Sequence, residues 1–158
     1  MQLPLLRIDD RLVHGQVLVG WAAALRPAQV LLASDAVAGD PLRRQVYAAL
    51  PAEDFAIDVQ GLATAAATLR RGGRVLAVCA SPADARQLFD LGCGLAAVNL
   101  GGLRGPGRRQ LLPFVYLTPQ DVADLRALLS RGVAVEAREL PGSRAVRVDE
   151  ALLAPLWE

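Results

Sequence analysis

The chemistry of this chain centres on its single histidine, His14, in the segment RIDDRLVHGQV (residues 7–17), where two arginines and two aspartates precede it. A neutral imidazole offers a nucleophilic nitrogen near pH 7. Arginine can neutralise phosphoryl oxygens, and a carboxylate can fix the tautomer of the ring. The segment therefore favours phosphoryl transfer through the imidazole. In the alternative reading, the histidine is a surface or structural residue and the charged run only solvates a loop.

The flanking residues predict how this imidazole is positioned. Apolar runs at 3–8 and 17–25 indicate a strand before the segment and a helix after it. A helix start binds anions through its free N–H groups, and its positive end favours a neutral ring. Gly15 would let a phosphate approach closely. Arg11 could contact the phosphoryl group, and Asp9 or Asp10 could orient Arg11 or the ring.

The rest of the chain alternates between strand and helix patterns. Aspartate, serine or threonine directly precedes a proline at 40–41, 81–82 and 118–119, which is typical of helix starts, and Gly92 and Gly132 mark two helix ends. We therefore predict an α/β fold, a single domain with an open, mainly parallel β-sheet and helices on both faces. Residues 146–157 are expected to add a strand and a short helix. The predicted strands are residues 3–8, 29–33, 55–59, 74–79, 96–100, 114–117 and 133–138.

In such a sheet all strand-to-helix loops share one edge, where ligands bind. The loops are 9–15, 34–40, 60–61, 79–82 and 100–110, and they bring Asp35, Ser81, Asn99, Gly101 and Gly102 to the same rim as His14. These are candidate phosphate-binding or rim residues. The plainer alternatives are a helix cap for Ser81, a loop acid for Asp35 and a turn for the two glycines.

A basic loop follows on the same rim. Arg104, Arg108 and Arg109 lie among glycines and a proline, so they could steer an acidic partner or the incoming phosphate. The alternative is a solvated surface loop.

Composition excludes several classes of protein. A net charge of +1 without interleaved basic and aromatic residues argues against binding to nucleic acid. Two cysteines and one histidine make neither a disulfide framework nor a zinc set, so we expect no metal and no cofactor. Charges interrupt the first apolar run, and no run is long enough to span a bilayer. We expect a cytoplasmic protein.

The sequence also resembles a known family. RIDDRLVHGQV, with Trp21 shortly after it, is similar to the opening motif of IIB components of the mannose/sorbose-type sugar phosphotransferase system. Residues 98–103, VNLGGL, resemble the Asn-x-Gly-Gly segment of that family. Further similarity lies in the second loop, at 34–40, and in the strand, helix and strand between 115 and 133. The resemblance implies one IIB domain over residues 1–158.

The resemblance also implies a function. In that family the motif histidine accepts a phosphoryl group from a phosphohistidine of a IIA partner and passes it to a sugar entering through membrane IIC and IID proteins. It implies that His14 is the nucleophile, that Arg11 stabilises the phosphoryl oxygens and that Asp10 orients Arg11 or the ring. Two alternatives stay open: a regulatory phosphoprotein that signals through protein contacts, and a freestanding enzyme with His14 as general base.

Overall fold

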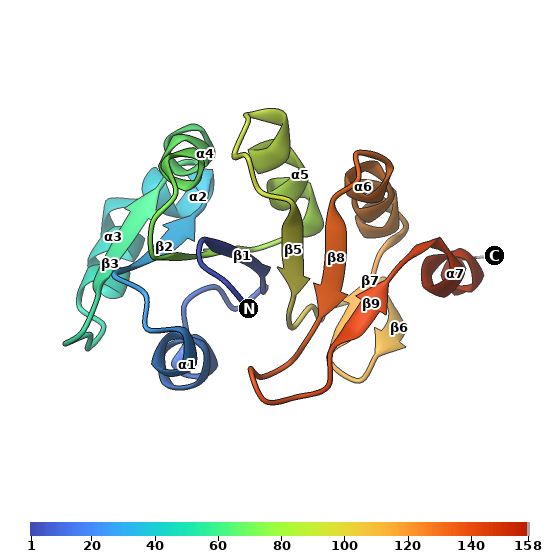
Figure 1. Cartoon of the computed structure of the whole chain (residues 1–158), viewed down its shortest axis with the longest axis horizontal. Helices are drawn as coiled ribbons and strands as arrows, with labels where there is room; N and C mark the ends of the chain where they lie inside the picture. The colour runs from blue at the N-terminus through green and yellow to red at the C-terminus, as the bar shows by residue number, and fades with distance from the viewer. Residues whose placement is uncertain (158) are drawn as a thin grey trace.

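The computed structural model describes residues 1–157, and its centre is a seven-stranded sheet in the order β3-β2-β4-β1-β5-β8-β9 (Figure 1). Neighbouring strands run parallel except β9, which is antiparallel to β8. The predicted α/β class is confirmed. The strands are β1 (Leu5–Ile8), β2 (Gln29–Ala33), β3 (Ala56–Gln60), β4 (Val75–Cys79), β5 (Ala97–Leu100), β8 (Ala134–Ala137) and β9 (Val146–Val148).

Helices cover both faces of the sheet, as the sequence predicts. On one face, α4 (Leu62–Arg71), α5 (Pro82–Asp90) and α6 (Pro119–Ser130) pack on the larger core cluster (Figure 1). The C-terminal α7 (Glu150–Leu153) adds Leu153 to this cluster and continues into the 3₁₀ helix η2 (Ala154–Trp157).

The opposite face is covered by the elements that follow β1 and β2. These are the π-helix η1 (Gln16–Ala22), the short α1 (Ala23–Leu25), α2 (Asp35–Ala38) and α3 (Pro41–Ala48). The core cluster on this face contains no side chain from β5, β8 or β9. The connector between β8 and β9, residues 138–145, lies on this side of the sheet (Figure 1).

The predicted helix starts are confirmed. The side chains of Asp40 and Ser81 accept hydrogen bonds from the first turns of α3 and α5. Thr118 and Asp121 form a reciprocal capping box at the start of α6.

One predicted strand has a different place. Residues 114–117 were expected in the parallel sheet, but β7 (Val115–Leu117) pairs antiparallel with β6 (Arg109–Leu112) in a separate two-stranded sheet. Residues 100–110 likewise lead into β6 and not into a helix. A parallel neighbour of β5 would need a crossover of about a dozen residues, usually with a helix, and the segment between β5 and β7 contains none. A short apolar strand without a crossover pairs with the strand next to it in sequence.

The position of β1 matters most for function. β1 lies between β4 and β5, so the loops after these three strands meet at one edge of the sheet. No helix among residues 1–157 is long and apolar enough to cross a membrane.

Candidate functional site

The loop that carries His14 is fixed by its neighbours on both sides. The Asp9 N–H donates to the Cys79 carbonyl at the end of β4, and the Asp10 N–H donates to the Gly102 carbonyl after β5. Leu12 has a left-handed backbone (φ 59°), and its side chain is buried in the core. A bulky residue adopts that conformation only when its surroundings impose it. The loop is therefore held in one shape before the chain enters η1.

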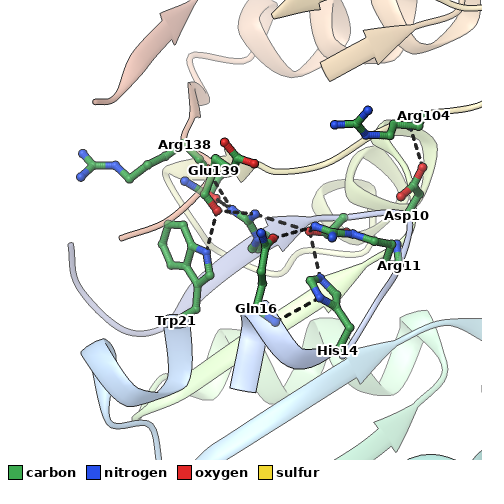
Figure 2. A network of polar contacts seen from close by, with 11 residues as sticks. Asp10, Arg11, His14, Gln16, Trp21, Arg104, Arg138 and Glu139 are labelled. Carbon is green, nitrogen blue, oxygen red and sulfur yellow. Dashed lines mark hydrogen bonds and ion pairs between the residues drawn. The ribbon is translucent and has the colours of Figure 1, made fainter. Parts of the chain in front are cut away.

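Both ring nitrogens of His14 have a defined partner. Nε2 lies 3.2 Å from Asp9 Oδ2, and the backbone N–H of Gln16 lies 3.3 Å from Nδ1 (Figure 2). A nitrogen that accepts an N–H carries no proton, so the proton of the neutral ring is on Nε2, where it donates to Asp9. This tautomer leaves the lone pair on Nδ1, and the side chain is 18 % exposed.

The carboxylate at this site belongs to Asp9 and not to Asp10. Asp9 is fully buried, and its Oδ1 accepts from the backbone N–H and Nε of Arg11, at 3.1 and 3.3 Å. The structure corrects the expectation for Asp10, whose Oδ2 accepts from the Arg104 N–H at 2.7 Å. The sheet extends to residue 8 and Asp9 N–H bonds to β4, so Asp9 points inward whereas Asp10 reaches the basic loop.

A second arginine, Arg7 of β1, supports Asp9 from behind. Arg7 is completely buried, and its Nη2 lies 3.4 Å from Asp9 Oδ2. Its Nη1 donates to Asn99 Oδ1 at 2.6 Å. Burial lowers the pKa of Arg7 to about 10, against the opposing effect of Asp9, so the guanidinium keeps its charge at neutral pH.

The two glycines after β5 make room for the arginines. A Cβ on Gly101 would lie 2.4 Å from Cζ of Arg7, and one on Gly102 would lie 3.3 Å from Nη2 of Arg11. The Gly101 N–H donates to the Ile8 carbonyl at 2.7 Å, so it is not available to a phosphate. Neither residue has a positive φ, so close approach and not a turn requires glycine at 101.

Burial and neighbouring charges determine the protonation states of His14 and Asp9. Burial lowers the pKa of His14; Asp9 raises it in part, and the charges of Arg11 and Arg7 lower it further. Burial alone would raise the pKa of Asp9, but hydrogen bonds from Arg11 and the charge of Arg7 bring it below the usual value. The neutral imidazole expected from the sequence is supported, with burial as the larger cause. The site thus combines an ionised carboxylate with a neutral ring.

This arrangement gives a pH prediction. The imidazole of His14 is expected to titrate with a midpoint below 6.5, because the fold disfavours its protonated form. More than half of the rings are therefore still neutral at pH 6.5, and most of the protonation occurs at lower pH. Proton NMR of the ring C–H signals measures this directly, since the chain has one histidine. A midpoint above 6.5 would show that the Asp9 carboxylate outweighs burial and the arginines.

Two predicted rim residues serve as helix caps. Asp35 Oδ1 accepts from the Leu62 N–H at 2.8 Å and so caps α4, whose own N-cap residue, Gly61, has no side chain. Ser81 caps α5 through the Asp84 N–H at 3.1 Å. Ser81 is therefore the helix cap that the plainer alternative predicts. Asp35, expected in that alternative to be only a loop acid, also bonds to a helix start. Gly15 precedes η1, with open space where a Cβ would lie.

The basic loop is partly tied to the protein. Arg108 pairs with Asp121 at 3.0 Å, and the guanidinium of Arg109 lies 4.2 Å from the ring centre of Trp157. Arg109 belongs to β6 and not to a loop. Arg104 is exposed, with its guanidinium 5.7 Å from the ring centre of Tyr116, and its backbone contact to Asp10 places it beside the loop of His14 (Figure 2).

Sequence reasoning missed the inner half of the site. It weighed Asp9 only as an alternative to Asp10, and it gave Arg7 no role, although a charged residue within an otherwise apolar strand was a signal. Asn99 was placed on the rim, and the structure adds its bond to Arg7. The Gln16 side chain, whose Oε1 accepts from Nη2 of Arg11 at 2.8 Å, had no signal. Among residues 1–157 no cluster of three or more histidine, cysteine or acidic side chains is arranged to hold a metal ion.

Comparisons with known proteins agree with this architecture. The family model described as "PTS system sorbose subfamily IIB component" matches residues 3–154. The fructose-specific EIIB component of the phosphotransferase system (PTS) of Bacillus subtilis is 32 % identical, over 89 % of this chain and 90 % of that protein. The mannose-specific EIIAB component of Escherichia coli is 28 % identical, over 89 % of this chain and 45 % of that protein.

A solved structure gives the same result. The IIBSor domain of the sorbose permease from Klebsiella pneumoniae superposes with a TM-score of 0.82 at 30 % identity, over 92 % of this chain and 93 % of that one. The matched region includes the His14 loop, the strands beside it and the glycines after β5. The chain therefore belongs to the sorbose subfamily of IIB components of the sugar phosphotransferase system.

Proposed function

We propose that this chain is a cytoplasmic phosphocarrier in which His14 receives a phosphoryl group on Nδ1 and then delivers it to a sugar. IIB components are phosphotransferases of the sugar phosphotransfer cascade, which supports the reaction class. The observation that carries the proposal is the arrangement of the single imidazole. Nε2 faces the buried carboxylate of Asp9, and the lone pair of Nδ1, on the other side of the ring, accepts the Gln16 N–H at 3.3 Å.

The proposed donor is a phosphohistidine of a IIA protein. The name of the mannose-specific EIIAB relative, in which a IIA part accompanies the IIB part, supports such a partner. The membrane IIC and IID proteins would present the sugar. We propose no nucleic-acid partner and no cofactor, because the chemistry needs only positioning and neutralisation of charge.

Each transfer is an in-line displacement at phosphorus. The lone pair of Nδ1 leaves the Gln16 N–H and forms the new N–P bond, while the donor N–P bond breaks and its electron pair returns to the donor imidazole. The proton stays on Nε2 and keeps its hydrogen bond to Asp9, whose negative charge stabilises the positive charge of the phosphorylated ring. In the second step a sugar hydroxyl oxygen attacks the phosphorus and its proton passes to solvent water, while the Nδ1–P bond breaks and restores the lone pair of Nδ1.

The direct test is intact-mass measurement. The pure protein would be incubated with a phosphorylated IIA protein and then with membranes that carry IIC, IID and a sugar. We expect the mass to rise by one phosphoryl group and to return to its starting value when sugar is present. No gain in mass would refute the carrier role. A gain that sugar does not reverse would favour the regulatory phosphoprotein.

Arg11 is proposed to hold phosphoryl oxygens during transfer. Its side chain is 49 % exposed, and its fork is oriented by Asp9 and Gln16. Arg11→Lys keeps the charge but loses the planar pair of donors, so we expect a transfer rate about 10- to 1000-fold lower. Labelling from the IIA donor, quenched at a series of times, measures the rate. A rate within about twofold of wild type would show that Arg11 does not hold the phosphoryl oxygens and is only a charged loop residue.

Of the three arginines of the basic loop, Arg104 is the one we propose for partner docking. Arg104→Ser is expected to slow second-order transfer at low salt, because exposed charges act on the encounter rate and salt screens them. Arg108→Ser should instead lower the melting temperature, because it breaks the ion pair with Asp121. If Arg104→Ser transfers at the wild-type rate at every salt concentration, the loop is only a solvated surface.

A further inference from the structure

Trp21, which follows the segment of His14 in sequence, has no role in the proposed transfer. It lies on η1, is completely buried, and its indole Nε1 donates to the Glu139 carbonyl at 3.2 Å (Figure 2). The guanidinium of Arg7 lies 4.5 Å from the centre of its ring. Trp21 thus contacts the cation that supports Asp9 without reaching the reacting nitrogen.

We propose that Trp21 is a positioning residue for His14: together with the Glu139 carbonyl it holds Arg7, which fixes Asp9 and thereby the orientation of the imidazole. This inference rests on the proposed function, since it assigns how the same site is held in its reactive form.

The first step of the argument is that Arg7 is gripped from several sides. Its Nη2 donates to the Glu139 carbonyl at 3.1 Å, which is the same oxygen that accepts from Trp21. Its Nη1 donates to the Arg138 carbonyl at 2.8 Å. A desolvated guanidinium over an indole face is stabilised by cation–π attraction. Trp21 and the connector between β8 and β9 therefore close two sides of the Arg7 site.

The second step concerns how Arg7 responds when the indole is removed. Its Nε has no hydrogen-bond partner among residues 1–157, and Gly101 lies against the guanidinium. If the indole is lost, the guanidinium can tilt into the vacated space. Its contact with Asp9 Oδ2 is already long, at 3.4 Å, and the same oxygen faces Nε2 of His14. A shift of Arg7 is thus passed through one carboxylate oxygen to the ring.

The chain supplies a matched control for this inference. Trp157, the other tryptophan, also packs against an arginine, at 4.2 Å from Arg109, and its Nε1 also donates to a backbone carbonyl, that of Leu117, at 3.2 Å. Trp157→Phe therefore removes the same two kinds of contact, at a half-buried position, without touching Arg7, Asp9 or His14. Any effect shared by both variants reflects loss of tryptophan packing in general.

The experiment compares Trp21→Phe with Trp157→Phe by two readouts. The first is the pair of ¹⁵N ring signals of the single histidine, which report how the proton is divided between Nδ1 and Nε2. The second is single-turnover phosphorylation by a saturating IIA donor. For Trp21→Phe we expect the ring signals to move toward those of a free histidine and the saturated rate to fall on the order of tenfold, as small misplacements of reacting groups do. Half-saturation by the donor should stay unchanged, and Trp157→Phe should match wild type in all three measurements.

If Trp21→Phe does not fold, a second variant tests the positioning role of Trp21. In the Trp157→Phe background, Trp21 can be replaced by β-(3-benzothienyl)alanine, which has the shape of tryptophan with sulfur in place of the indole N–H. We expect it to shift the ring signals in the same direction. The inference is overturned if the ring signals of the Trp21 variants coincide with those of Trp157→Phe. Ring signals that shift in a protein that accepts no phosphoryl group would uphold the positioning role and refute the carrier function instead.

Discussion

Replacing His14 by alanine is expected to abolish acid-labile phosphorylation altogether. A phosphoryl group on an imidazole nitrogen hydrolyses in acid and survives alkali, and the chain has no second histidine to accept it. The side chain is not part of either hydrophobic core cluster, and its two ring nitrogens contact Asp9 and the Gln16 backbone, so the variant should remain folded. Labelling from a phosphorylated IIA donor, followed by acid and alkali treatment, measures the loss.

The matched comparison is His14→Gln, which keeps a polar side chain that can bond to Asp9. It too should take up no label, because an amide nitrogen is not a nucleophile at neutral pH. Residual acid-labile label in either variant would place the phosphoryl group on another side chain and remove the basis of the proposed function.

Asp9→Asn is expected to lower the saturated transfer rate by about 10²- to 10⁴-fold. An asparagine can turn its amide N–H toward Nε2 of His14, which would move the ring proton to Nδ1 and block the attacking lone pair; losses of this order occur when an aspartate that orients a catalytic histidine is so replaced. The pKa of His14 should fall further, because the carboxylate is the group that raises it. Single-turnover labelling and NMR titration measure the two effects.

Asp10→Asn is the control for this variant. It makes the same chemical change one residue away, where the side chain accepts from the Arg104 N–H through one oxygen that an asparagine retains. We expect its saturated rate to stay near wild type. If Asp10→Asn proved as damaging as Asp9→Asn, the assignment of the orienting carboxylate to Asp9 would be wrong.

The sequence predicted the parallel sheet and the position of His14 because those features depend on local signals. Apolar runs, caps such as Ser81 and the glycine that ends a helix act within a few residues. The sequence-based choice of Asp10, where the structure has Asp9, shows what local signals cannot predict. Which of two adjacent carboxylates points inward depends on hydrogen bonds to β4 and β5, strands that lie about 70 and 90 residues further along the chain.

The inner support of the site was harder to predict for the same reason. A buried arginine is costly unless several distant groups satisfy it, and the partners of Arg7 come from β5, η1 and the connector after β8. The prediction for residues 114–117 was wrong for another reason. Their apolar pattern does form a strand, but no crossover precedes it, so it pairs with β6 and not with the parallel sheet.

The fit of Gly101 against Arg7 constrains how this protein can change over generations. With 2.4 Å between the position of a Cβ and Cζ of Arg7, any side chain at 101 is incompatible with the guanidinium, while a smaller residue at 7 alone would leave Asp9 without its inner cation. A substitution of Gly101 is therefore harmful while Arg7 is present, and a substitution of Arg7 is harmful while Gly101 is present. The two positions behave as one heritable unit, and a related sequence that has lost the glycine is expected to have lost the arginine as well.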